Sequence, residues 1–186
     1  MKMNKKRSIQ MKIGFIGLGI MGCPMAKHLV KAGFDVLVAD LDAEKVAELV
    51  KEGATEATYQ EMGEQCELVI TILPTGTIVE GVLFGENGVA STMKKGIVVD
   101  HSSVTPEESR NCYEKLKAQG VGFLDAPVSG GEPGAQWPGA MSQGQGWRER
   151  GIQKRKRIIR LFVRAWPFLR EIRCYTWRPA SSTLSG

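Results

Sequence analysis

Short apolar runs alternate with amphipathic segments from residue 12 to about residue 134. The runs that predict strands are residues 12–17, 35–40, 68–73, 97–100 and 122–125. The segments between them repeat apolar residues every three or four positions, which is the period of an α-helix. Alternation of strands with helices is typical of βα units around a parallel sheet. We therefore expect an α/β fold with a doubly wound parallel sheet.

Local signals at the helix ends support this interpretation. The predicted helices are residues 21–32, 43–51, 58–63, 78–84 and 106–119. Gly33 suits the position that closes the first helix, and Asp42 can cap the N-terminus of the second. The sequence Thr105-Pro106-Glu107-Glu108 combines a capping hydroxyl, a proline in the first turn and a glutamate three residues after the cap. This capping box predicts the start of the last helix.

The regular pattern ends near Ala135, and all four tryptophans lie beyond it. Residues 141–186 contain 11 Lys and Arg against two Asp and Glu, whereas residues 1–140 contain 14 against 18. The net charge of +5 therefore comes from the carboxy-terminal segment. We expect a basic disordered extension over residues 1–10, one domain over residues 11–135 and a basic tail rich in Trp and Arg over residues 136–186.

Three interpretations of this tail are open. Arginine neutralises phosphates and tryptophan stacks on bases, so the tail could be a nucleic-acid-binding arm. Residues 157–168 could instead form a basic amphipathic helix for a partner or a membrane surface. The abrupt loss of pattern inside a domain favours the third interpretation, a shifted reading frame whose product has no selected structure. We therefore expect a disordered tail and neither a nucleic-acid partner nor a membrane partner.

The composition excludes several classes of protein. With 42% hydrophobic residues the chain is too apolar to be disordered throughout, and no apolar stretch is long enough to span a membrane. The basic residues 1–10 are not followed by the apolar region and cleavage site of a secretory signal. The four cysteines are widely spaced without a Cys-x-x-Cys pair, which predicts reduced thiols rather than a zinc site or disulfides. These features favour a cytoplasmic protein.

A glycine-rich loop, Gly17-Leu18-Gly19-Ile20-Met21-Gly22, directly follows the first predicted strand. This spacing between a strand and a helix is the dinucleotide-binding fingerprint of Rossmann-type folds. Gly17 makes the tight turn, Gly19 lets the backbone approach a pyrophosphate, and Gly22 permits close packing of the helix on the strand. The helix N-terminus stabilises an anion without a basic side chain. We predict that these six residues bind a dinucleotide; the alternative is a glycine-rich turn that binds nothing.

The second predicted strand ends at Asp40, about twenty residues beyond the loop, where the fingerprint expects an acidic residue. Its carboxylate would accept hydrogen bonds from the adenosine ribose hydroxyls and repel a 2′-phosphate. No arginine follows in Leu41-Asp42 to neutralise such a phosphate. NAD is therefore expected rather than NADP, although Lys45 could still reach a 2′-phosphate.

Four segments, in this order, resemble the β-hydroxyacid dehydrogenases, the family of 3-hydroxyisobutyrate dehydrogenases and tartronate semialdehyde reductases. They are GFIGLGIMGCPMAKHL, TILPTGTIVEGVLFGENGV, VVDHSSVTP and DAPVSGGEPGA. The resemblance runs from Met11 to Ala135 and covers only the amino-terminal part of such enzymes. It implies NAD or NADP as cofactor, a small hydroxy or oxo acid as substrate, and a homo-oligomer in the family.

The resemblance also implies roles for particular residues. Those that would line the cofactor are Leu73, Pro74 and, by the nicotinamide end, Ser103. Those that would receive the substrate carboxylate are Ser129, Gly130 and Gly131. A hydroxyl beside consecutive N–H groups in a glycine turn is suited to binding an anion, so the chemistry agrees with this role. The alternative for this segment is a linker turn.

The family's catalytic lysine lies in a Gly-x-x-x-Lys-x-x-x-Asn pattern beyond the nucleotide domain and is followed by a helical domain. The pattern does not occur in the 186 residues, and Lys154 and Lys156 lack its surroundings. A positioned general acid contributes about 10²–10⁴-fold to the rate. We therefore assign no catalytic residue and expect very low activity.

The function that these features favour is an NAD-dependent oxidoreductase of small hydroxy or oxo acids. Glu132-Pro133-Gly134 resembles the tartronate semialdehyde (2-hydroxy-3-oxopropionate) reductases, and 3-hydroxyisobutyrate dehydrogenase is the alternative within the family. A non-catalytic dinucleotide-binding module and a nucleic-acid-binding protein are the alternatives from other classes. Dehydrogenases of the 6-phosphogluconate type share the glycine loop, but the segment DAPVSGGEPGA suits smaller acids.

Overall fold

The computed structural model describes residues 11–129 and 141–142. Six parallel strands form one sheet: β1 (Lys12–Ile16), β2 (Asp35–Ala39), β3 (Thr55–Glu56), β4 (Leu68–Thr71), β5 (Ile97–Asp100) and β6 (Gly122–Asp125). The described helices are α1 (Gly22–Lys31), α2 (Ala43–Lys51), α3 (Tyr59–Gln65), α4 (Gly76–Phe84), α5 (Val89–Thr92) and α6 (Pro106–Ala118). None of these helices is long and apolar enough to cross a membrane.

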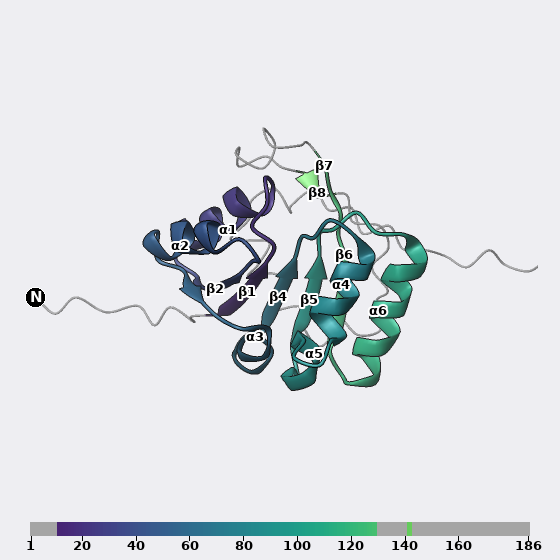
Figure 1. Ribbon diagram of the computed structural model, residues 1–186. Coiled ribbons are helices and arrows are strands. Elements are labelled where there is room, and N and C mark those ends of the chain that lie inside the picture. Colours follow the sequence, from purple (N-terminus) through teal and green to yellow (C-terminus); the bar gives the residue numbers. More distant parts are fainter. Residues whose placement is uncertain (1–10, 130–140, 143–186) are drawn as a thin grey trace, which may run out of the picture.

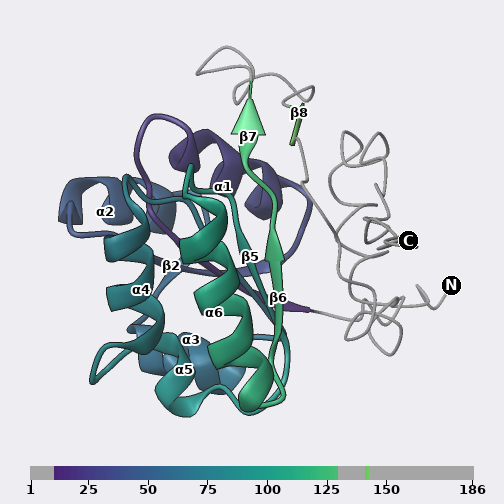
Figure 2. The same cartoon turned by 90° about the vertical axis from the view of Figure 1, so that its right-hand side faces the viewer.

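The sheet has the strand order β3-β2-β1-β4-β5-β6, and the direction of winding reverses between β1 and β4 (Figure 1). Helices α1 and α2 pack on one face, and α3 to α6 pack on the other (Figure 2). In β4, Leu68 and Ile70 belong to the core under α1 and α2, whereas Val69 belongs to the opposite core. Burial on both faces explains why the central strands are apolar along most of their length. The doubly wound parallel sheet that the alternating pattern predicted is confirmed.

The helix starts lie where the capping residues predicted them. The side chain of Asp42 accepts a hydrogen bond from the N–H of Glu44 at 3.1 Å. In the capping box of α6, the N–H of Glu108 donates to Thr105 Oγ1 at 3.3 Å and the N–H of Thr105 donates to the Glu108 carboxylate at 2.8 Å. A second capping box, which starts α3 at Thr58, was not predicted. Each such cap contributes about 1 kcal/mol to helix stability.

Several boundaries differ from the prediction, and two short elements were not predicted. Strand β4 ends at Thr71 rather than at residue 73, because the N–H of Leu73 donates to Ser102 Oγ instead of to a strand. Helix α4 begins before residue 78, because Thr75 Oγ1 caps it by accepting from the N–H of Ile78. The short elements β3 and α5 were not predicted, since two to four residues carry no measurable period.

The segment after β6 was predicted as a loop, but it begins with a short strand. Strand β7 (Val128–Ser129) pairs antiparallel with β8 (Met141–Ser142), beyond the carboxyl end of β6 (Figure 2). A pair of two-residue strands leaves no periodic signal in a sequence. Residues 1–10 and the rest of the segment 136–186 lie outside the described residues, so the predictions made for them stay predictions.

Candidate functional site

The carboxyl ends of the parallel strands meet at one edge of the sheet, which is where ligands of open α/β sheets bind. The predicted cofactor residues lie in loops at this edge, except Gly22, which is the first residue of α1. They are the glycine loop after β1, Asp40 after β2, Leu73 and Pro74 after β4, and Ser103 after β5. The fold therefore brings together side chains that the sequence distributes over four βα units.

Glycines shape the loop between β1 and α1. Gly17 has a φ of 98°, and a Cβ there would collide with the carbonyl oxygen of Ile72. A Cβ on Gly22 would collide with the carbonyl oxygen of Gly17. A Cβ on Gly19, in contrast, would meet no atom within 4 Å. Gly17 and Gly22 are thus required by contacts within the chain, whereas Gly19 borders open space.

Helix α1 begins at this loop without a side-chain cap. Met21, at the N-cap position, makes no side-chain hydrogen bond, and the first turn contains no acidic residue. Helices α2, α3, α4 and α6, in contrast, are all capped by side-chain oxygens. The partial positive charge at the start of α1 is therefore not compensated by a capping side chain, which suits an anion.

Asp40 joins the glycine loop to the turn before α2. One of its carboxylate oxygens accepts a hydrogen bond from the N–H of Leu18, and the other accepts one from the N–H of Asp42 at 2.9 Å. A carboxylate offers about four acceptor positions, so capacity remains for further donors. The acid expected by the fingerprint lies beside the loop, and its bond to Leu18 is a structural role that sequence reasoning missed.

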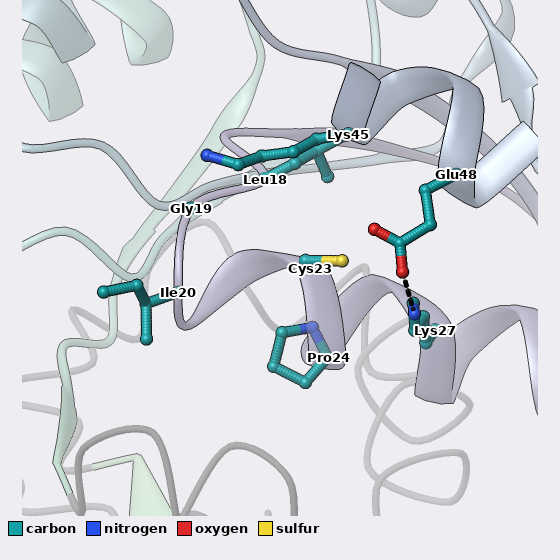
Figure 3. Close-up of a pocket in the computed structure, with 8 residues that line it drawn as sticks. All are labelled: Leu18, Gly19, Ile20, Cys23, Pro24, Lys27, Lys45 and Glu48. Carbon is teal, nitrogen blue, oxygen red and sulfur yellow. Dashed lines mark hydrogen bonds and ion pairs between the residues drawn. The ribbon is translucent and has the colours of Figure 1, made fainter. Parts of the chain in front are cut away.

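A cavity of about 400 Å³ opens between the glycine loop, α1 and α2 (Figure 3). Its lining residues are Leu18, Gly19, Ile20, Cys23, Pro24, Lys27, Lys45 and Glu48. Lys27 Nζ lies 2.6 Å from a carboxylate oxygen of Glu48, and Lys45 Nζ lies 3.3 Å from one of Asp42. Both lysines at this cavity are therefore already paired. The thiol of Cys23 also lines the cavity, and burial raises its pKa, so it stays protonated at neutral pH and is a poor nucleophile.

A buried polar cluster lies at the ends of β4 and β5. Asp100 Oδ1 accepts hydrogen bonds from Thr71 Oγ1 at 2.8 Å and from Ser102 Oγ at 2.6 Å. Ser102 Oγ in turn accepts one from the N–H of Leu73 at 2.8 Å. Sequence reasoning missed this cluster. The signal that could have found it is the polar run Asp100-His101-Ser102-Ser103 directly after an apolar strand, because buried polar groups require partners.

The buried His101 predicts a loss of stability in mild acid. Its ring Nδ1 lies 2.5 Å from the carbonyl oxygen of Ala126. Burial lowers the pKa of the imidazole below its ordinary 6.5, against the opposing effects of this carbonyl and of Asp100. Below pH 6.5 the unfolded chain therefore binds more protons than the folded chain, so the free energy of unfolding falls as the pH falls. One proton gives a slope of at most about 1.4 kcal/mol per pH unit.

Urea unfolding between about pH 7.5 and about pH 5.5 measures this slope. Burial raises the pKa of the Asp125 carboxyl, and this group acts in the opposite sense. We expect the free energy of unfolding to fall with pH in the unchanged chain and in His28→Asn, which removes the chain's other histidine. His101→Asn should lose most of this dependence on pH. A slope that persists in His101→Asn and disappears in His28→Asn would contradict the assignment.

The segment implied to receive a substrate carboxylate is described only at its first residue. Ser129 lies in β7, in register with Met141 of β8. Gly130 and Gly131 lie outside the described residues. The role of these three residues therefore stays a prediction.

Comparison with protein families agrees with this geometry. The sequence model of one family, described as the NAD binding domain of 6-phosphogluconate dehydrogenase, matches residues 12–161. The match includes the glycine loop, Asp40 and the loops after β4 and β5. It also extends past residue 135, so the domain boundary predicted there stays a prediction.

Curated proteins are similar over part of the chain. The chain is 44% identical to the 3-hydroxyisobutyrate dehydrogenase of Pseudomonas aeruginosa over 126 residues, which are 67% of this chain and 42% of that protein. It is 42% identical to the 2-hydroxy-3-oxopropionate reductase of Escherichia coli over 128 residues, which are 68% of this chain and 44% of that protein. The chain thus spans less than half the length of these curated relatives.

The fold is also similar to that of solved structures. The crystal structure of 3-hydroxyisobutyrate dehydrogenase from Salmonella typhimurium matches with a TM-score of 0.71 and 28% sequence identity. The match covers 81% of this chain and 53% of that chain. It confirms the Rossmann-type architecture that the glycine loop predicted.

Proposed function

The chain belongs to the family of the NAD binding domain of 6-phosphogluconate dehydrogenase, and from this premise we propose that it binds NADH at the carboxyl edge of its sheet. The observation that carries the proposal is the uncapped start of α1 behind a loop in which Gly19 borders open space. A pyrophosphate needs a close approach to the backbone and a positive helix end, and this loop offers both. The described residues therefore fit a dinucleotide.

The charges around Asp40 support NADH rather than NADPH. The Asp40 carboxylate keeps acceptor capacity for ribose hydroxyls, and its negative charge would repel a 2′-phosphate. Lys45 is the cation best placed to neutralise such a phosphate, but it forms an ion pair with Asp42 at 3.3 Å. The hydrogen bond from Lys45 also lowers the pKa of the Asp42 carboxyl, which favours its charged form.

The reaction that the relatives suggest is hydride exchange with a small hydroxy or oxo acid. A bound nicotinamide supplies or accepts the hydride. In this chain Asp40 would hold the adenosine ribose, and Leu73 and Pro74 would line the cofactor. Ser103 is exposed at the end of β5 and would lie by the nicotinamide. The segment Ser129-Gly130-Gly131 would receive the carboxylate through a hydroxyl and backbone N–H groups.

Among these acids we favour tartronate semialdehyde, which is 2-hydroxy-3-oxopropionate. The support is the sequence Glu132-Pro133-Gly134 after the glycine pair. The alternative is 3-hydroxyisobutyrate, because the relatives that act on the two acids are 42% and 44% identical to the chain and therefore do not discriminate between them.

The 186-residue chain should bind cofactor without turning over substrate. Its sequence contains no Gly-x-x-x-Lys-x-x-x-Asn pattern, so no residue is assigned as the general acid. Loss of a positioned acid lowers a rate by about 10²–10⁴-fold. A non-catalytic dinucleotide-binding module is the second candidate function, and NADH binding without turnover of either acid would support it.

Calorimetric titration of the purified chain with NADH and NADPH, beside assays with both acids, tests the proposal. We expect NADH to bind in the micromolar range, roughly the range of enzyme cofactors and substrates, and NADPH to bind at least about tenfold more weakly. Neither acid should be turned over. A cooperatively folded chain that does not bind NADH would overturn the proposed function. Turnover at an ordinary enzyme rate would show that the chain supplies a general acid.

A further inference from the structure

Ser102 is buried at the end of β5 but contacts the turn that the proposed function places against the cofactor. We propose that Ser102, oriented by Asp100, is a positioning residue that fixes the Leu73-Pro74 turn for the nicotinamide half of the dinucleotide. This inference rests on the proposed function, because it assigns a role within the same site. It goes beyond that function by naming a residue that does not touch the cofactor itself and acts on it only through Leu73.

The hydroxyl hydrogen of Ser102 is committed to one acceptor. Ser102 Oγ lies 2.6 Å from Asp100 Oδ1, and because a carboxylate oxygen can only accept, the hydroxyl donates to it. The backbone N–H of Ser102 donates to the same oxygen at 3.0 Å. The lone pairs of the hydroxyl therefore remain for Leu73, whose N–H donates to Ser102 Oγ at 2.8 Å.

Asp100 is itself held in place. Thr71 and Asp100 face each other in the register of β4 and β5, and Thr71 Oγ1 donates to Asp100 Oδ1 at 2.8 Å. Asp100 is 1% exposed and Ser102 is 2% exposed, so water does not compete for these bonds. Hydrogen bonds to a carboxylate are strong, and they are stronger away from water. Two of the three donors on this oxygen belong to Ser102 itself, its N–H and its hydroxyl, and these two bonds orient its side chain.

Leu73 is the residue at which the chain leaves the sheet. The N–H of Ile72 still donates to the carbonyl of Ile16 at 3.0 Å, whereas the N–H of Leu73 turns to Ser102. Leu73 Cδ2 lies 3.1 Å from the position of a Cβ on Gly17, so a shift of Leu73 would also reach the glycine loop. Ser103 follows Ser102 directly. One buried hydroxyl therefore anchors both segments that are proposed to meet the nicotinamide half.

A matched pair of variants separates positioning from stability. Ser102→Ala removes the hydroxyl that accepts from the N–H of Leu73. Thr71→Val removes a hydroxyl that donates to the same carboxylate and leaves the bond between Leu73 and Ser102 in place. Both variants lose one buried hydrogen bond to Asp100, so both should lower the melting temperature. Titrations with NADH and with ADP then locate the effect, because ADP carries the adenosine and phosphates but no nicotinamide.

We expect Ser102→Ala to weaken NADH binding roughly tenfold and to change ADP binding by less than about twofold. Thr71→Val should leave both affinities within about twofold. Unchanged NADH affinity in Ser102→Ala, an equal loss for ADP, or an equal loss in Thr71→Val would overturn the positioning role. An unchanged chain that binds neither ligand would overturn the proposed function, and this role with it.

A measurement on the unchanged chain covers the case in which Ser102→Ala does not fold. In nuclear magnetic resonance titrations, the backbone amide signal of Leu73 should shift with NADH and stay in place with ADP. A signal that shifts equally with both ligands, or with neither, would overturn the assignment of this turn to the nicotinamide half.

Discussion

Gly22→Ala should abolish NADH binding and destabilise the fold together. A methyl group on Gly22 would collide with the carbonyl oxygen of Gly17 and would lie 2.9 Å from Ile72 Cγ2. A backbone carbonyl cannot rotate out of the way as a side chain can, so α1 must move away from the loop. Overpacking typically costs about 1–3 kcal/mol, and we expect the upper end of this range or more. NADH affinity should fall by more than about 100-fold, which corresponds to about 2.7 kcal/mol.

Gly19→Ala should abolish NADH binding without loss of stability. The added methyl group would meet no atom within 4 Å, so the free energy of unfolding should stay within about 0.5 kcal/mol of its original value. If a pyrophosphate approaches the backbone here, the methyl group occupies its space, and the loss of affinity should match that of Gly22→Ala. Loss of NADH binding without loss of stability distinguishes a glycine that faces a ligand from a glycine that packs within the chain.

Gly81→Ala is the matched control for both variants. Gly81 is exposed in α4, and a Cβ there would also meet no atom within 4 Å. Alanine in a helix interior is favoured over glycine by about 0.5–1 kcal/mol, so this variant should be slightly more stable and bind NADH normally. Urea unfolding and NADH titration of the three variants provide the comparison. Normal binding in Gly19→Ala would contradict the role of the loop, and unchanged stability in Gly22→Ala would contradict the steric argument.

The longer strands could be predicted from sequence because helices bury both faces of the sheet. All four residues of β4 are buried, and the first three, Leu68, Val69 and Ile70, form a continuous apolar run. Both residues of β3 are exposed, and the strand exists only because Thr55 and Glu56 pair with β2. Its formation depends on a neighbour that is distant in sequence, and no local pattern encodes that.

In the candidate site, too, features with a local sequence pattern could be predicted, whereas contacts between distant segments could not. The glycine loop and Asp40 could be predicted because the turn, the helix start and the acid have fixed spacings along one βαβ unit. The contacts of Ser102 could not be predicted, because they need β4 and β5 side by side. Thr71 and Asp100 are 29 positions apart in sequence and meet only through the strand order of the sheet.

Asp40→Ala should lower NADH affinity and remove the preference for NADH over NADPH. The Asp40 carboxylate holds the N–H groups of Leu18 and Asp42, and it is proposed to accept the ribose hydroxyls as well. Hydrogen bonds to charged groups contribute about 1.5–3 kcal/mol, so NADH affinity should fall roughly 10- to 100-fold. NADPH loses an unfavourable contact with the carboxylate, so its affinity should fall far less. Fluorescence titrations with both cofactors measure the ratio.

Asp42→Asn separates the contact made by Asp40 from the local charge. Asparagine caps a helix about as well as aspartate, so α2 should keep its cap, and Asp40 keeps its bond to the backbone N–H of residue 42. The substitution removes one negative charge and releases Lys45 from its ion pair. NADH affinity should therefore stay within about threefold, while NADPH affinity rises about two- to fivefold, an effect of the size expected for an exposed ion pair. If Asp42→Asn removed the preference as fully as Asp40→Ala, the discrimination would come from net charge at this turn and not from a contact with the ribose.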